Sequence, residues 1–277
     1  AFATFAGTAL GSGTADGRII FAAEPALLGG GGATGSTTMS ILPGARVGND
    51  LAWHGTNGIR ALVATEYRDV AGNDINSAGL TENVRFTNAA PAAWPPLTAP
   101  RTVNALVLPS GNATWAMSNT LTLTSGQLLS TPNNSRNITA GTLTAGSGSD
   151  AELDITVLAN TVTIGTTATI SDNGAGKVTL TKNGAGTLSL ANNGMDNDYS
   201  GGTFLNEGGL TTGTTTNRRY LGRGPVRVDN AILTLGAIGA TTNSTGADYT
   251  AVNGGYIAIP TAPHAAGDTF YVGAGSI

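Results

Sequence analysis

The carboxylates are the residues whose types and spacing come closest to those of a catalytic site. Asp150, Glu152 and Asp154 occupy alternate positions, so they would share one face of a β-strand. Glycoside hydrolysis usually uses two carboxylates roughly 5–10 Å apart across a cleft. We favour a solvated strand edge as the interpretation of this trio. We therefore expect no catalytic residues, no cofactor site and no enzymatic activity.

A second pair of carboxylates, Asp196 and Asp198, lies in a loop rich in glycine and asparagine. Carboxylate and amide oxygens are ligands that Ca²⁺ accepts in proteins. The loop lacks the further acidic residues of a known calcium motif, and aspartate side chains commonly cap turns. Turn capping is the preferred interpretation, and calcium at Asp196 and Asp198 is kept as the one metal hypothesis.

Two other patterns were tested for chemistry. His54 and His264 are far apart in the chain, and neither belongs to a pair with metal-ligand spacing. The segment Ser171–Lys177 is not a phosphate loop, because Ser171 stands where that motif needs glycine and Val178 where it needs Ser or Thr. We expect the histidines to be surface or loop residues.

Seven residues are candidates for contact with a partner. They are Arg218, Arg219, Arg223, Arg227, Trp53, Trp94 and Trp115. The arginines form the one basic cluster, which would suit an acidic partner or a glycan, although a solvated turn is the simpler interpretation. The tryptophans are the side chains that an adhesin would stack against sugars, although a loop anchor is the simpler interpretation of each.

The composition indicates which elements position these residues. Of the 277 residues, 11% are charged, against roughly 25% in an average soluble domain. Lys and Glu favour helices, whereas the Thr and Val that are abundant here favour strands. The net charge of −4 and the scattered basic residues argue against a nucleic-acid partner. The absence of cysteine removes a disulfide framework and cysteine-based metal sites.

The chain carries no sign of a membrane span or of a leader. No apolar run approaches the roughly 18 residues that a transmembrane helix needs, and no signal peptide opens the sequence. The first residue is Ala1 rather than Met. We interpret the chain as a processed or internal piece of a longer protein.

Short apolar strands alternate with turns rich in Gly and Asn from about Arg101 onward. Strict alternation places one face of each strand inward and the other outward. Leu188, Leu210 and Leu233 are 22 and 23 residues apart, and Leu121 and Leu143 are again 22 apart. A repeat of this length suits one coil of a β-solenoid, whereas a sandwich has no reason to keep such a period. The spacing predicts an all-β fold of stacked parallel coils with aliphatic residues inside.

The chain divides into two predicted regions. Residues 101–277 are predicted to form the β-solenoid. Residues 1–100 are less regular and are predicted to form irregular coils or a cap. Within them, residues 89–100 contain four prolines, which neither a central strand nor a helix interior accepts, so a loop leaving the coil stack is expected.

Residues 178–236 carry the most specific pattern. They contain Val-Thr-Leu-Thr-Lys-Asn-Gly-Ala-Gly-Thr-Leu-Ser-Leu, then Tyr-Ser-Gly-Gly-Thr, Asn-Glu-Gly-Gly-Leu and Leu-Gly-Arg-Gly-Pro-Val-Arg-Val, in that order. This order resembles the autotransporter-associated β-strand repeat. The resemblance implies a right-handed parallel β-helix of a large secreted or surface-displayed bacterial protein, usually without chemistry of its own. Asp196, Asp198 and the turn Asn217–Tyr220 depart from the family pattern without disturbing the fold prediction.

The function expected from these observations is structural. We expect an extracellular or outer-surface segment of a larger bacterial protein, forming a fibre, a surface layer or an adhesin stalk by stacking and lateral contact. Open β edges invite addition, so the expected partners are further copies or the rest of a longer chain. Two alternatives stay open: a carbohydrate-active β-helix enzyme with carboxylates in a groove, and an adhesin that binds surface glycans through exposed aromatic residues.

Overall fold

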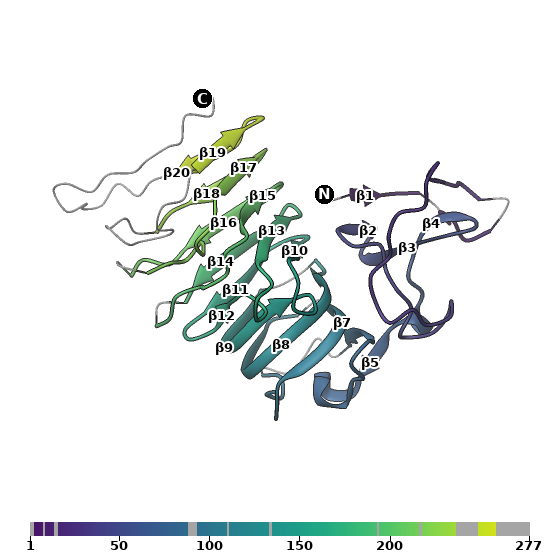
Figure 1. Cartoon of the computed structure of the whole chain (residues 1–277), viewed down its shortest axis with the longest axis horizontal. Helices are drawn as coiled ribbons and strands as arrows, with labels where there is room; N and C mark the ends of the chain where they lie inside the picture. Colours follow the sequence, from purple (N-terminus) through teal and green to yellow (C-terminus); the bar gives the residue numbers. More distant parts are fainter. Residues whose placement is uncertain are drawn as a thin grey trace.

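The computed structural model describes residues 3–7, 9–13, 16–87, 93–109, 111–132, 135–192, 194–215, 218–236 and 249–258. The fold is all-β, and its parallel strands stack as a β-solenoid of about 7 turns (Figure 1). The fold class predicted from the alternation and the repeat is confirmed. Three short 3₁₀ helices interrupt the early strands: η1 (Ala64–Glu66), η2 (Ala71–Asn73) and η3 (Ile75–Ser77). None of the described helices has the length and apolar character needed to cross a membrane.

The first face of the solenoid is a ladder of parallel strands that runs along the whole stack. In spatial order they are β5 (Arg68–Val70), β6 (Asn83–Phe86), β7 (Arg101–Leu108), β8 (Ala113–Ser130), β10 (Ala151–Val157), β13 (Val178–Asn183), β15 (Gly202–Leu205), β17 (Val226–Asp229) and β19 (Tyr249–Val252). Each strand pairs in parallel with the next. Parallel pairing of consecutive coils is what the repeat predicts.

A second face forms beside it from the other half of each coil. Its strands are β8, β9 (Arg136–Ala145), β11 (Thr161–Gly165), β14 (Thr187–Ala191), β16 (Gly208–Thr212), β18 (Ala231–Thr234) and β20 (Tyr256–Ala258), with β12 (Thr169–Ile170) pairing with β9. β8 serves both faces because it bends at Gly126, where the backbone has a φ of 74°. A Cβ at Gly126 would lie 1.7 Å from the carbonyl oxygen of Glu152, so only glycine fits this bend.

The 22- and 23-residue spacing is the length of a coil. Leu188 pairs in register with Leu210, Leu210 pairs with Leu233, and all three are buried. Middle coils are longer, since Thr142 and Thr169 are register partners 27 residues apart. Aliphatic side chains therefore stack on one another along the axis, and they form one continuous core from Val70 to Tyr249.

The N-terminal residues build a separate small sheet. Its strands are β1 (Ala3–Phe5), β2 (Ala45–Val47), β3 (Asp50–Gly55) and β4 (Gly58–Ala61), with β1 parallel to β2 and the other two pairs antiparallel. This sheet lies against the outer side of the first face (Figure 1). Met39, Ile41 and Leu51 pack there on the outward-facing Val107 and Leu129. The coil stack itself begins at β5, within the first hundred residues.

The proline-rich segment does not leave the coil stack over its described part, residues 93–100. Ala93 forms a parallel bridge with Thr114, and the Leu97 N–H donates to the Met117 carbonyl oxygen. Prolines lack the N–H group that a full strand needs, so the segment follows β8 without becoming a regular strand. Trp94 and Leu97 are buried. Residues 88–92 lie outside the described part of the chain.

Candidate functional site

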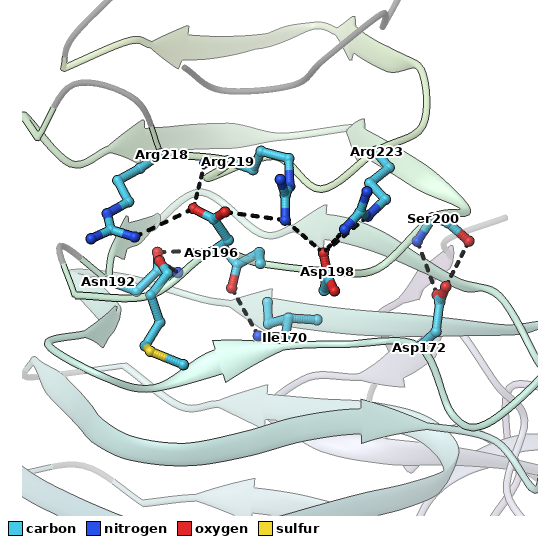
Figure 2. A network of polar contacts seen from close by, with 11 residues as sticks. Ile170, Asp172, Asn192, Asp196, Asp198, Ser200, Arg218, Arg219 and Arg223 are labelled. Atoms are coloured by element: carbon cyan, nitrogen blue, oxygen red, sulfur yellow. Dashed lines mark hydrogen bonds and ion pairs between the residues drawn. The ribbon is translucent and has the colours of Figure 1, made fainter. Parts of the chain in front are cut away.

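A cluster of charged side chains joins two consecutive coils within the motif region. Residues 192–201 connect β14 to β15, and residues 213–225 connect β16 to β17 one coil further along. Because the coils stack in register, the two connections lie one above the other. Figure 2 shows Asp196 and Asp198 of the first connection pointing toward Arg218, Arg219 and Arg223 of the second.

Arg219 stands at the centre of this cluster. Its Nη2 lies 3.1 Å from Asp196 Oδ2 and 2.9 Å from Asp198 Oδ1. Arg223 donates to Asp198 Oδ1 through Nε at 2.9 Å and through Nη2 at 2.5 Å. Arg218 is more distant, with its Nη1 3.9 Å from Asp196 Oδ1. We call these five residues the Asp/Arg clasp.

The electrostatics of the clasp are those of an ion-pair network. Burial would raise the pKa of Asp198, but the hydrogen bonds from Arg223 and Arg219 hold it below its usual value. Three guanidinium groups already neutralise the two carboxylates. No cluster of three or more His, Asp or Glu side chains that could hold a metal occurs among the described residues. Calcium at Asp196 and Asp198 stays a prediction, and a cation there would have to displace the arginine partners.

The residue between the two aspartates, Asn197, ties three coils together. Its Oδ1 accepts from the Ile170 N–H at 2.8 Å, and its Nδ2 donates to the Tyr220 carbonyl oxygen at 2.7 Å. Its own N–H donates to the Arg219 carbonyl oxygen at 2.8 Å. Asn197 is fully buried, so these bonds satisfy backbone groups that water cannot reach. The sequence signal for this role is the order Asp196-Asn197-Asp198. From the sequence, only the two aspartates were interpreted as candidate site residues.

Arg227 does not belong to the basic cluster that the sequence suggested. It lies on β17 and pairs with Asp229 on the same strand, Nη2 to Oδ2 at 2.9 Å. Its neighbours in sequence alternate inward, so Arg227 points outward from the first face, whereas the clasp arginines occupy the connection before it. The four arginines therefore form two sites and no single basic patch.

Two of the three candidate tryptophans are core residues and are not exposed to a glycan. Trp94 and Trp115 are 4% and 1% exposed and pack edge-to-face with Phe86. Trp115 Nε1 also donates to the Pro95 carbonyl oxygen at 2.8 Å. Trp53 is half-buried in the N-terminal sheet, where the Arg60 guanidinium lies 4.4 Å from its ring centroid. The aromatic platform expected of a glycan adhesin is not formed by these residues.

The acidic trio does not meet in an open cleft. Asp150 is exposed and its Oδ1 accepts from the Lys177 N–H at 2.9 Å, and Glu152 is also exposed. Asp154 is only 3% exposed, although it faces outward from β10. The solvated strand edge is therefore correct for Asp150 and Glu152 and wrong for Asp154. His54 is buried beside the ring of Phe21, and His264 lies outside the described residues.

Asp154 belongs to a buried polar row that the sequence did not reveal. Its register partners are Gln127 on β8 and Thr181 on β13, and both are at most 2% exposed. Gln127 Nε2 donates to the Ala45 carbonyl oxygen of the N-terminal sheet at 3.0 Å. Desolvation raises the pKa of Asp154 to about 6, although its Oδ1 accepts from the Thr156 hydroxyl at 2.8 Å. We call Gln127, Asp154 and Thr181 the covered row.

A buried lysine replaces an aliphatic residue inside the stack. Lys182 lies in register between Ile155 and Leu205, and its side chain is fully buried. Its Nζ donates to three carbonyl oxygens, those of Asn183, Gly184 and Glu207, at 2.7–3.1 Å. Burial lowers the pKa of Lys182 to about 8. The lysine therefore closes a turn from the inside and offers no reactive amine to solvent.

A match to a known protein family lies within the motif region. Residues 180–211 match the family model described as the passenger-associated-transport-repeat. This match and the β-solenoid fold fit the resemblance to the autotransporter-associated β-strand repeat. The matched range holds β14 and both aspartates of the clasp. No curated protein matches the chain, and no solved structure matches it.

Proposed function

We propose that this chain is a rod-forming segment of a secreted or surface-displayed protein, and that its role is structural. The observation that carries the proposal is the unbroken parallel ladder from β5 to β19. The passenger-associated-transport-repeat and the solenoid fold together support a passenger-domain β-helix. Such repeats suggest a structural role and a secreted or surface location.

The coil stack suits a structural role for a physical reason. Each coil contacts only its neighbours, so stability adds coil by coil and length can grow without a larger core. Each coil adds about 4.8 Å of rise, because that is the spacing of hydrogen-bonded strands. The Asp/Arg clasp and Asn197 add polar cross-links between coils to the aliphatic stack. These features favour stiffness along the axis.

Self-association or continuation into further coils is the expected mode of assembly. Within the described residues, β19 pairs only with β17, and β20 only with β18. An unpaired strand edge is a template for another strand. Ile232 and Tyr256 are register partners and are 51% and 61% exposed, so adjacent apolar side chains face outward on the last two described strands of the second face. Both features would support end-to-end or lateral contact between rods.

Imaging of the native particle tests the proposal most directly. Negative-stain electron microscopy of the parent protein on cells and after purification should show rods, fibres or an ordered array outside the cell. Protease treatment of intact cells should remove the chain if it is displayed. A compact cytoplasmic particle that survives this treatment would refute the structural surface role.

A carbohydrate-active enzyme receives no support from the described carboxylates, because Asp154 is buried whereas Asp150 and Glu152 are exposed, so the three do not share an open surface. Cleavage of neutral or acidic polysaccharides by the purified chain would establish this alternative. Glycan adhesion would need a surface other than the tryptophans, two of which are in the core.

A further inference from the structure

A cavity of about 350 Å³ opens where the N-terminal sheet meets the coil stack. Its lining comes from the turn before β3 and from the carboxyl ends of β6, β7 and β8, which are three successive coils. The lining residues are Asn49, Asp50, Arg85, Phe86, Val107, Pro109, Thr131 and Pro132. The volume falls within the range of about 300–1,000 Å³ that is typical of small-molecule sites. We call it the junction cavity.

The charged groups of the junction cavity are held in place before any ligand binds. Arg85 donates to Asp69 through Nε at 2.8 Å and Nη2 at 3.0 Å. The same guanidinium stacks 4.6 Å from the centroid of the Tyr67 ring. The buried Tyr67 hydroxyl accepts from the Leu51 N–H at 3.0 Å and lies 3.3 Å from Asp50 Oδ1. Both charges therefore point into the cavity from fixed positions.

Each charged side chain keeps hydrogen-bonding capacity for a ligand. Of the Arg85 nitrogens, Nη1 makes no hydrogen bond to the described residues, and Asp50 Oδ2 accepts none from them. Burial raises the pKa of Asp50, although Tyr67 and Arg85 oppose this effect. A carboxylate that is partly desolvated and incompletely hydrogen-bonded favours a ligand that donates to it.

The chemistry of these groups selects the class of ligand. A ligand must donate to Asp50 and accept from Arg85, and a sugar hydroxyl does both. Asp69 already neutralises Arg85, so Asp50 leaves the site with a net charge of −1, which repels carboxylates and phosphates. An ammonium ion offers no acceptor to Arg85. Of the apolar lining residues, Pro109 and Pro132 are partly exposed and can contact the C–H face of a sugar ring, whereas Phe86 and Val107 are buried beneath them.

We propose that the junction cavity binds one unit of a neutral glycan, with its hydroxyl groups bridging Asp50 and Arg85. This binding goes beyond the proposed structural role, because the coil stack can form a rod whether or not a sugar is bound. It replaces the three tryptophans, which the sequence suggested, as the place where this chain would meet a surface glycan. The N-terminal sheet then has a function beyond covering the first face, because its turn at Asn49 and Asp50 completes the cavity.

Glycan-array screening of the purified full chain, followed by isothermal titration of the best neutral saccharide, tests this site. Asp50→Asn should weaken binding at least tenfold, and Asn49→Trp, at an exposed turn position, should block the cavity without touching either charge. Asp229→Asn, at a partly exposed aspartate on β17, is the matched control and should leave binding unchanged. The corresponding uronic acid should bind more weakly than the neutral sugar.

Three results would overturn the proposal. One is the absence of any neutral saccharide with a Kd below about 10 mM. Another is binding that survives both Asp50→Asn and Asn49→Trp in variants whose circular dichroism and melting temperature match the parent chain. The third is tighter binding of the uronic acid. None of these results bears on rod formation, which electron microscopy measures independently.

Discussion

Replacing Asp154 by asparagine should change how the stability of this protein depends on pH. The aspartate lies in the covered row, and its pKa rises from 3.8 to about 6 on folding. The folded state therefore binds this proton more tightly than the unfolded chain does. Its contribution to stability is complete below pH 3.8 and is lost as the pH rises through 6. The full loss is about 3 kcal/mol, at 1.36 kcal/mol for each pH unit between the two values.

Asparagine removes this titration and keeps most contacts. Its Oδ1 can still accept from the Thr156 hydroxyl, as Asp154 Oδ1 does at 2.8 Å. Its Nδ2 replaces Asp154 Oδ2, which has no hydrogen-bond partner in the described part of the chain. The neighbouring side chains are those of Thr181, the register partner of Asp154, and Asn183, whose hydrogen bond lowers the pKa of the aspartate. Position 154 then carries no buried charge at neutral pH.

Urea unfolding of the parent chain and of Asp154→Asn at pH 4, 5, 6 and 7 measures the effect. The free energy of unfolding of the variant relative to the parent should rise by about 2 kcal/mol between pH 4 and pH 7. Asp229→Asn controls for the loss of a carboxylate at a partly exposed ion pair and should show a nearly constant difference. A difference for Asp154→Asn that does not vary with pH would refute the burial of an ionising Asp154 in the covered row.

Three further predictions concern the coil stack. Asn197→Ala should lower the free energy of unfolding by about 3 kcal/mol, because it leaves buried backbone groups of two coils without partners; a loss below about 1 kcal/mol in urea titration would contradict its cross-linking role. Gly126→Ala should lower the melting temperature far more than Gly148→Ala. Both glycines have a positive φ, but only a Cβ at position 126 would clash with backbone, namely the carbonyl oxygen of Glu152. Equal shifts of the melting temperature would count against this contact. Asp198→Ala should lower the free energy of unfolding by at most about 1 kcal/mol, as the loss of an exposed ion pair does. Saturating calcium should not change the melting temperature of the parent chain or of the variant. A calcium-dependent rise in the parent chain alone would support calcium binding at this aspartate.

The parts of the fold that the sequence predicted correctly depend on neighbours in the chain. Leu188, Leu210 and Leu233 have a fixed spacing because each coil adds one parallel strand, and the three leucines are indeed register partners. The 27-residue coils escaped detection, because longer connections change the spacing without changing the register. The Asp/Arg clasp was visible as two groups of charged residues, but their pairing was not, since it requires the two connections to stack.

The sequence alone thus determined three features: strand alternation, the coil length in the motif region and the family-like order of residues. Each of these is a local property of the chain. Only the tertiary structure decided which outward faces meet water. The N-terminal sheet packs on the first face and bonds to Gln127, the register partner of Asp154, and Asp154 is buried although it alternates outward. The same contact forms the open junction cavity, which brings together Asp50 and Arg85 from distant parts of the chain. Burial and the pKa values that follow from it depend on distant segments, so no pattern along one strand could have predicted them.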